Sequence, residues 1–108
     1  MTVTGSRPES RNALQRQRRR AKDAYTKSKL AFFTGMNELT DLRYEQARLQ
    51  STQIEEIPLD EDEETRLQSL PQQIAEKEKA VYTLDAEVQA WEQALAKIDE
   101  LLASKSEE

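Results

Sequence analysis

The sequence contains no cysteine and no histidine among its 108 residues. Without cysteine the chain has no disulfide bond and no thiolate nucleophile or ligand, and without histidine it lacks the commonest metal ligand and general base. No nucleophile–base pair or metal-ligand set can be assembled from the residues that remain. We therefore expect a protein that is not an enzyme and that uses no cofactor or metal ion.

Glycine and proline are also scarce, with two and three residues, and no long apolar run occurs. Apolar residues make up 36% of the chain and charged residues 34%, which is typical of long helices rather than of a compact sheet protein. No stretch approaches the ~18 apolar residues of a membrane span, and the first residues lack the apolar core of a signal peptide. We expect a soluble intracellular protein, cytoplasmic or nuclear, with no membrane span.

Positive charge is concentrated at one end of the chain, although the net charge is -5. Residues 1–30 hold nine Lys or Arg against two acids, and residues 31–108 hold seven against nineteen. The basic residues that could bind an anion or a nucleic acid are Arg11, Arg16, Arg18, Arg19, Arg20, Lys22, Lys27 and Lys29. We call these eight residues the basic arm.

Apolar residues recur at alternating steps of three and four in the C-terminal third of the sequence, with one lysine at a position where the pattern expects an apolar residue. This heptad pattern continues for about five repeats and predicts a coiled-coil helix. We call the following set the seam, which is expected to form the coiled-coil or partner interface: Leu67, Leu70, Ile74, Lys77, Val81, Leu84, Val88, Trp91, Leu95, Ile98 and Leu102.

Three capping patterns and the prolines predict where helices begin. Ser6 with Glu9 indicates a first long helix over 7–54, whose basic segment covers 7–29. Asp60 with Glu63 indicates a short helix over roughly 60–68, inside an acidic connector over 55–68. Ser69 with Gln72, around Pro71, indicates a second long helix over 69–104. Residues 1–6 and 105–108 are expected to be disordered tails.

Small and large residues alternate along one stripe of the first predicted helix. Tyr25, Phe32 and Leu39 each follow a small residue by four positions, and those small residues are Ala21, Ser28 and Gly35. Small residues would let a neighbouring helix approach closely. Alternatively, Gly35 breaks the helix in two, but a cost of about 1 kcal/mol relative to alanine is small enough for a long packed helix to absorb, and we expect a continuous helix.

The predicted fold class is all-α: an elongated antiparallel helical hairpin with coiled-coil packing, which could dimerise into a bundle. A turn near residue 60 would bring the basic arm beside the acidic residues of positions 91–108, so the two segments would partly neutralise each other. Parallel dimerisation through the second helix remains an alternative, because β-branched residues share one heptad position there. Trp91 would either fill the seam or be an anchor for a partner.

Leu30, Phe33 and Met36 lie off the main stripe of the first helix and form a second apolar surface. Unpartnered apolar residues of this kind indicate a protein partner or self-association. The basic arm surrounds its helix, so a single neighbouring helix cannot pair with all of it, and the remainder could bind phosphates. The acidic connector could bind a divalent cation, but it lacks the glycine and distal glutamate of an EF-hand loop. A solvated cluster at a helix start is the simpler interpretation.

These observations together predict a non-enzymatic coiled-coil interaction or adaptor subunit, or scaffold, of a larger intracellular assembly. It would dock through apolar helix faces and the basic arm. The alternative is a nucleic-acid-binding accessory protein that uses the Arg-rich helix on phosphates and dimerises through the coiled coil.

Overall fold

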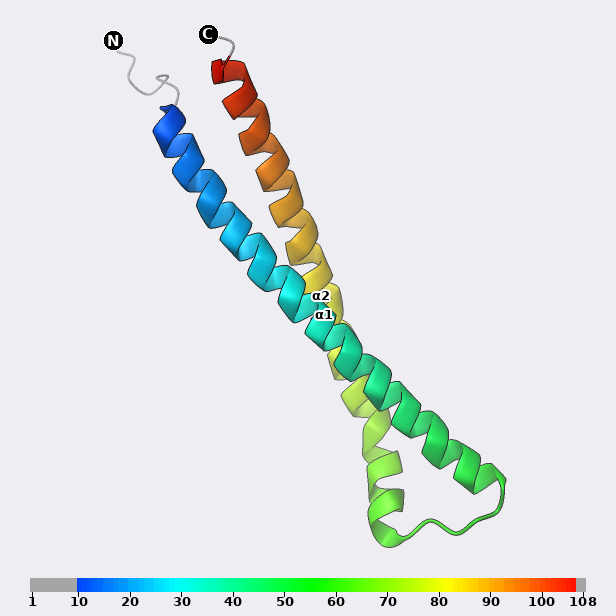
Figure 1. The fold of residues 1–108 in the computed structure, drawn as a ribbon. Coiled ribbons are helices and arrows are strands. Elements are labelled where there is room, and N and C mark those ends of the chain that lie inside the picture. The colour runs from blue at the N-terminus through cyan, green and yellow to red at the C-terminus, as the bar shows by residue number, and fades with distance from the viewer. Residues whose placement is uncertain (1–9, 107–108) are drawn as a thin grey trace.

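The computed structural model describes residues 10–106, which form an antiparallel hairpin of two helices (Figure 1). α1 spans Arg11–Ile54 and has 44 residues, whereas α2 spans Glu61–Ser106 and has 46. At 1.5 Å per residue each helix is about 65–70 Å long. No strand occurs in this described part of the chain, and the prediction of an elongated all-α hairpin is confirmed.

α1 begins at Arg11 rather than near residue 7, because Ser10 is its N-cap. The Ser10 backbone is extended (φ -64°, ψ 158°), and the hydroxyl accepts a hydrogen bond from Ala13 N at 3.1 Å. An N-cap side chain of this kind satisfies one of the amide groups that have no partner at a helix start. The capping pattern predicted at Ser6 and Glu9, and the predicted tail at 1–6, lie outside the described residues.

α1 ends in a Schellman motif whose left-handed residue is not glycine. Glu56 N donates to Gln53 O at 3.0 Å, and Ile57 N donates to Thr52 O at 3.2 Å. Glu56 has φ 61°, a left-handed conformation in which glycine is the usual residue. The end of α1 is therefore fixed by backbone hydrogen bonds at a cost in conformational strain.

The start of α2 is a capping box, as the sequence predicts. Asp60 Oδ1 accepts a hydrogen bond from Glu63 N at 2.8 Å, and Glu63 Oε1 accepts one from Asp60 N at 3.1 Å. The following residues, Glu61 to Glu64, fill the first turn of α2 with carboxylates, where the positive end of the helix dipole stabilises them.

The prediction of two separate helices over 60–68 and 69–104 is wrong, because α2 runs without a break through Pro71 to Ser106. Ser69 does not cap a new helix. Its hydroxyl donates to Arg66 O at 2.9 Å and accepts from the Gln73 side chain at 3.1 Å. Figure 1 shows that α2 changes direction in its yellow-green segment, near residue 70. Proline interrupts one backbone hydrogen bond and commonly bends a helix without ending it.

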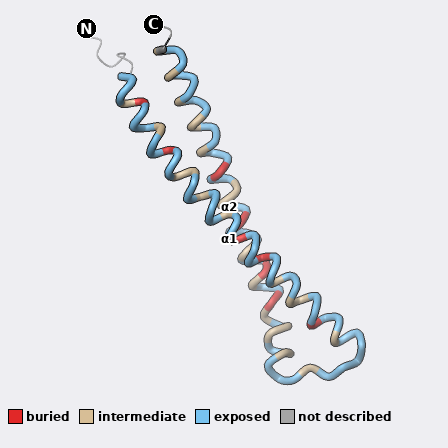
Figure 2. Tube along the Cα trace, viewed as in Figure 1, coloured by how far each residue is buried: buried red, intermediate tan, exposed pale blue. Residues whose placement is uncertain are grey.

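Figure 2 shows the buried residues as short red segments spaced along α1 and α2. In α1 these residues are Leu14, Ala21, Gly35, Leu39 and Leu49; in α2 they are Leu70, Ile74, Val81 and Val88. Leu49 and Leu70 are the most deeply buried and belong to one cluster towards the connector. Full burial of a leucine side chain contributes about 1.5–3 kcal/mol, so these buried residues hold the hairpin together.

α1 is continuous at Gly35, as predicted, and α2 approaches it very closely there. A Cβ atom at Gly35 would lie 3.0 Å from Val81 Cγ2 and 3.9 Å from Leu84 Cδ1. Ala21 is buried as well, and Ser28 is half-buried. The predicted role of small residues at the helix interface is confirmed for Gly35, where no side chain fits without movement of Val81.

Four ion pairs join the two helices and fix their register. The donor and acceptor atoms are 2.7 Å apart in Arg18–Asp99, 2.6 Å in Arg43–Glu78, 2.8 Å in Arg66–Glu45 and 3.0 Å in Lys77–Glu38. Exposed ion pairs contribute only about 0–1 kcal/mol each. Two of the four pairs have the base on α1 and two have it on α2, although α1 carries ten basic residues against four acids and α2 carries five against eleven.

Candidate interaction surfaces

The structure divides the basic arm into residues with partners and residues without them. Arg18 pairs with Asp99, and Arg11 donates to Leu102 O at 3.4 Å. The ammonium groups of Lys22 and Lys29 lie 5.9 and 5.3 Å from the centre of the Tyr25 ring, within cation–π range. The predicted neutralisation by the acidic end of α2 is therefore partial.

The remaining four members of the basic arm point into solvent. Within residues 10–106, no hydrogen bond or ion pair is made by Arg16, Arg19, Arg20 or Lys27, and all four are exposed. The first three line a shallow groove of about 280 Å³ together with Asp23. The structure thus presents four unpaired cations along one segment of α1.

Lys29 is held as a cation by its surroundings. Its Nζ donates a hydrogen bond to Tyr25 Oη at 3.1 Å. This hydrogen bond raises the pKa of Lys29 above its usual value, and the negative charge of Glu92 on α2 adds a smaller contribution. An ammonium with an acceptor and a nearby carboxylate loses its proton less readily.

The predicted seam lies along the contact between α2 and α1. Leu70, Ile74, Val81 and Val88 are buried, and the other seven members are half-buried: Leu67, Lys77, Leu84, Trp91, Leu95, Ile98 and Leu102. The burial follows from the heptad spacing, which keeps one stripe of a helix facing its neighbour. In the hairpin this stripe is covered by α1 of the same chain.

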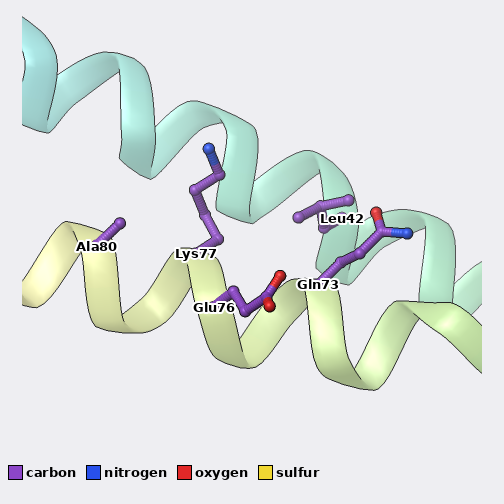
Figure 3. Close-up of a pocket in the computed structure, with 5 residues that line it drawn as sticks. All are labelled: Leu42, Gln73, Glu76, Lys77 and Ala80. Carbon is purple, nitrogen blue, oxygen red and sulfur yellow. The ribbon is translucent and has the colours of Figure 1, made fainter.

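Lys77 is the one charged member of the seam, and its side chain reaches across to α1 (Figure 3). The ammonium donates to Glu38 Oε1 at 3.0 Å, while the stem lines an open groove of about 280 Å³ with Leu42, Gln73 and other residues. A lysine can bury its stem and keep its charge at the surface. The charge of Lys77 is therefore paired with a glutamate of α1.

The second apolar surface is exposed in the hairpin. The exposed fractions are 67% for Leu30, 52% for Phe33 and 37% for Met36. The ring of Phe33 packs edge-on against that of Phe32, with 5.6 Å between their centres. A large apolar side chain that is open to solvent is suited to contact with a partner.

The acidic connector shows no cluster suited to a metal ion. Among residues 10–106 no group of three or more acidic side chains is arranged to hold one. Asp60 and Glu63 instead satisfy each other's backbone amides. Likewise, no helix within the described residues is long and apolar enough to cross a bilayer.

Sequence reasoning did not identify the two partners of any interhelical ion pair. Part of the signal was present: Glu78, Asp85, Glu92 and Asp99 on α2 are seven residues apart, and on α1 Lys22, Lys29 and Arg43 follow at steps of seven and fourteen. Only Arg43–Glu78 joins the two series, because Asp99 pairs with Arg18. Charges at heptad spacing beside an apolar seam commonly pair between helices. The hairpin register was needed to decide which residue faces which.

Comparison with known proteins gives no match to this chain: no family model fits it, and no curated protein or solved structure is significantly similar to it. Functional conclusions therefore depend on the surfaces of the hairpin itself.

Proposed function

We propose that this protein is a non-enzymatic adaptor subunit of a larger intracellular assembly. The observation that carries the proposal is the exposure of Leu30 and Phe33, at 67% and 52%, on a helix whose seam is already covered by α2. A two-helix hairpin buries one stripe of each helix, and any further apolar surface stays in water until a partner covers it.

The basic arm supports the same function, since it lies on the same helix as the second apolar surface. Arg16, Arg19, Arg20 and Lys27 extend the docking face by several turns towards the N-terminal end of α1. A partner with acidic residues beside an apolar patch would match both parts. Charge would steer the encounter, and the apolar contact would hold the complex.

Native mass measurement of the complex isolated from cells tests this proposal. The wild-type chain of 12.5 kDa is expected in an assembly of greater mass, and the double variant L30E/F33E should be released from it as a single chain. Ile54→Glu is the matched control, because Ile54 is 81% exposed at the far end of α1. A wild-type mass of one chain, or an unchanged complex with L30E/F33E, would contradict the proposal.

A second candidate function is nucleic-acid binding by the basic arm, favoured by the four cations that have no partner in residues 10–106. Phosphate binding would release counterions and give an affinity that falls steeply with salt. Dimerisation through the seam would first require the hairpin to open, since α1 covers the seam.

The test is binding of duplex and single-stranded oligonucleotides across a salt series. The triple variant R16A/R19A/R20A should abolish binding and leave the hairpin intact, because Arg18 keeps its ion pair with Asp99. Arg48→Ala removes an exposed arginine of α1 outside the basic arm and should leave binding nearly unchanged. Equal losses in both variants, or an affinity independent of salt, would rule this function out.

A further inference from the structure

Four acids of α2 are spaced seven residues apart and form a ladder of charges along one side of the hairpin. Two of them, Glu78 and Asp99, form ion pairs with Arg43 and Arg18 of α1, at 2.6 and 2.7 Å. Glu92, between them, forms no ion pair within residues 10–106, although its charge adds to the raised pKa of Lys29. The fourth acid of this heptad series is Asp85.

The register places Met36 where the ladder would need a base. Seven residues before Arg43 on α1 is Met36, and seven after Glu78 on α2 is Asp85. Because antiparallel helices run in opposite directions, an equal step on each helix leads from one pair to the next facing positions. Arg18, the partner of Asp99, lies about one turn beyond the position that equal steps from Arg43 and Glu78 would reach. Within residues 10–106, the Asp85 carboxylate accepts one hydrogen bond, from Gln89 Nε2 of its own helix at 3.1 Å.

An apolar groove of about 360 Å³ lies beside this half-buried carboxylate. Phe32 and Leu39 of α1 and Val81 and Tyr82 of α2 line it, and the Arg43 and Glu78 side chains complete its wall. Since Arg43 and Glu78 neutralise each other, Asp85 leaves the groove with one net negative charge. The Tyr82 side chain, 78% exposed, adds an aromatic ring next to it.

We propose that this groove binds a lysine or arginine side chain of a partner protein. The aliphatic stem would pack on Phe32, Val81 and Tyr82, and the cationic head would reach Asp85. A charge-assisted hydrogen bond to a half-buried carboxylate is stronger than a neutral one, and long basic side chains bury their stems while their heads stay polar. The bound cation would take the place in the ladder that Met36 leaves open.

This groove adjoins the second apolar surface, because Phe32 in its wall packs against Phe33. The charge of the groove nevertheless differs from that of the basic arm. The basic arm favours acidic groups, whereas the Asp85 groove favours a base. The adaptor function and this site can therefore fail independently in experiment.

The proposal can be tested with a synthetic leucine–lysine helical peptide of about four turns, titrated into the isotopically labelled full chain. Backbone NMR shifts are expected to change first around Tyr82 and Asp85. Asp85→Asn should lower the affinity for the peptide by about tenfold, which corresponds to the loss of one charge-assisted hydrogen bond. Met36→Lys should weaken it similarly, because the new lysine occupies the groove from within, and should raise the melting temperature of the free hairpin.

Glu87→Gln is the matched control, since Glu87 is an exposed acid of α2 outside the groove. The affinity of this variant for the leucine–lysine peptide should stay within about twofold of the wild-type affinity. Binding of a leucine–glutamate peptide of the same length should not change with Asp85→Asn. The proposal is overturned if the leucine–lysine peptide does not bind at millimolar concentration, if Glu87→Gln and Asp85→Asn weaken it equally, or if the shifts map elsewhere.

Discussion

Gly35 of α1 and Val81 of α2 are in such close contact that a Cβ atom at position 35 would lie 3.0 Å from Val81 Cγ2. Gly35→Ala gains about 1 kcal/mol of helix propensity, but overpacking against a stiff β-branched side chain costs about 1–3 kcal/mol. We expect a net loss of up to about 2 kcal/mol in the free energy of unfolding, measured by urea denaturation.

A double-mutant cycle of Gly35→Ala and Val81→Ala distinguishes this contact from a general effect of alanine at position 35. Val81→Ala removes the methyl group that Gly35→Ala would meet, so the alanine at position 35 should be less harmful, or stabilising, in the V81A background. Additive losses in the double variant would show that the close approach is not what disfavours alanine.

Glu56 has a φ of 61° at the end of α1, a backbone conformation that is strained for a residue with a Cβ atom. Glu56→Gly should increase the free energy of unfolding by about 1 kcal/mol, because glycine reaches the left-handed region without a Cβ clash. Glu55→Gly is the control: at φ -78° the glycine relieves no strain and only loosens the unfolded chain, so it should destabilise. Thermal unfolding followed by circular dichroism compares the two, and a destabilised E56G would be evidence against strain at this residue.

Pro71 lies inside α2, where it cannot donate to the carbonyl one turn before it. Proline costs about 3 kcal/mol in a helix interior, so Pro71→Ala should stabilise the hairpin by about 1–3 kcal/mol and straighten α2. The exposed neighbour Gln72 provides the comparison, since Gln72→Ala should change stability by less than about 0.5 kcal/mol. If P71A instead lowers the midpoint of urea unfolding, the bend itself is needed for the seam to pack.

Glu45 should make stability depend on pH in the acidic range. Arg66 donates hydrogen bonds to both carboxylate oxygens of Glu45 at 2.8 Å. These hydrogen bonds lower the pKa of Glu45 below its ordinary 4.5. A carboxyl whose pKa is lower in the folded state stabilises the fold above the unfolded pKa, and the contribution disappears as pH falls through the folded pKa.

The measurement is the melting temperature of wild type and Glu45→Gln from neutral pH downward. The variant should melt lower at neutral pH, and the difference should shrink once the pH falls below about 4.5. A gap that stays constant down to strongly acidic pH would mean that the ion pair with Arg66 does not cause it.

Local patterns in the sequence were sufficient to predict two long helices, the capping box at Asp60 and Glu63, and the seam of α2. These features depend on residue spacing and on hydrogen bonds between near neighbours, so the sequence by itself determines them. The continuous course of α2 through Pro71 was missed, since a Ser–Pro pattern matches a helix start equally well. Packing of Leu70 and Ile74 against α1 stabilises the helix on both sides of the proline.

Only the tertiary structure decided which residues of one helix meet which residues of the other. The sequence shows eight basic residues in one arm, but the register leaves Arg16, Arg19, Arg20 and Lys27 unpaired within residues 10–106 while Arg18 meets Asp99. A step of seven residues on each helix from the Arg43–Glu78 pair aligns Asp85 with Met36 rather than with a base. The physical reason is that a heptad pattern fixes the buried face of a helix, whereas the partner at each position depends on how far the two helices slide past each other.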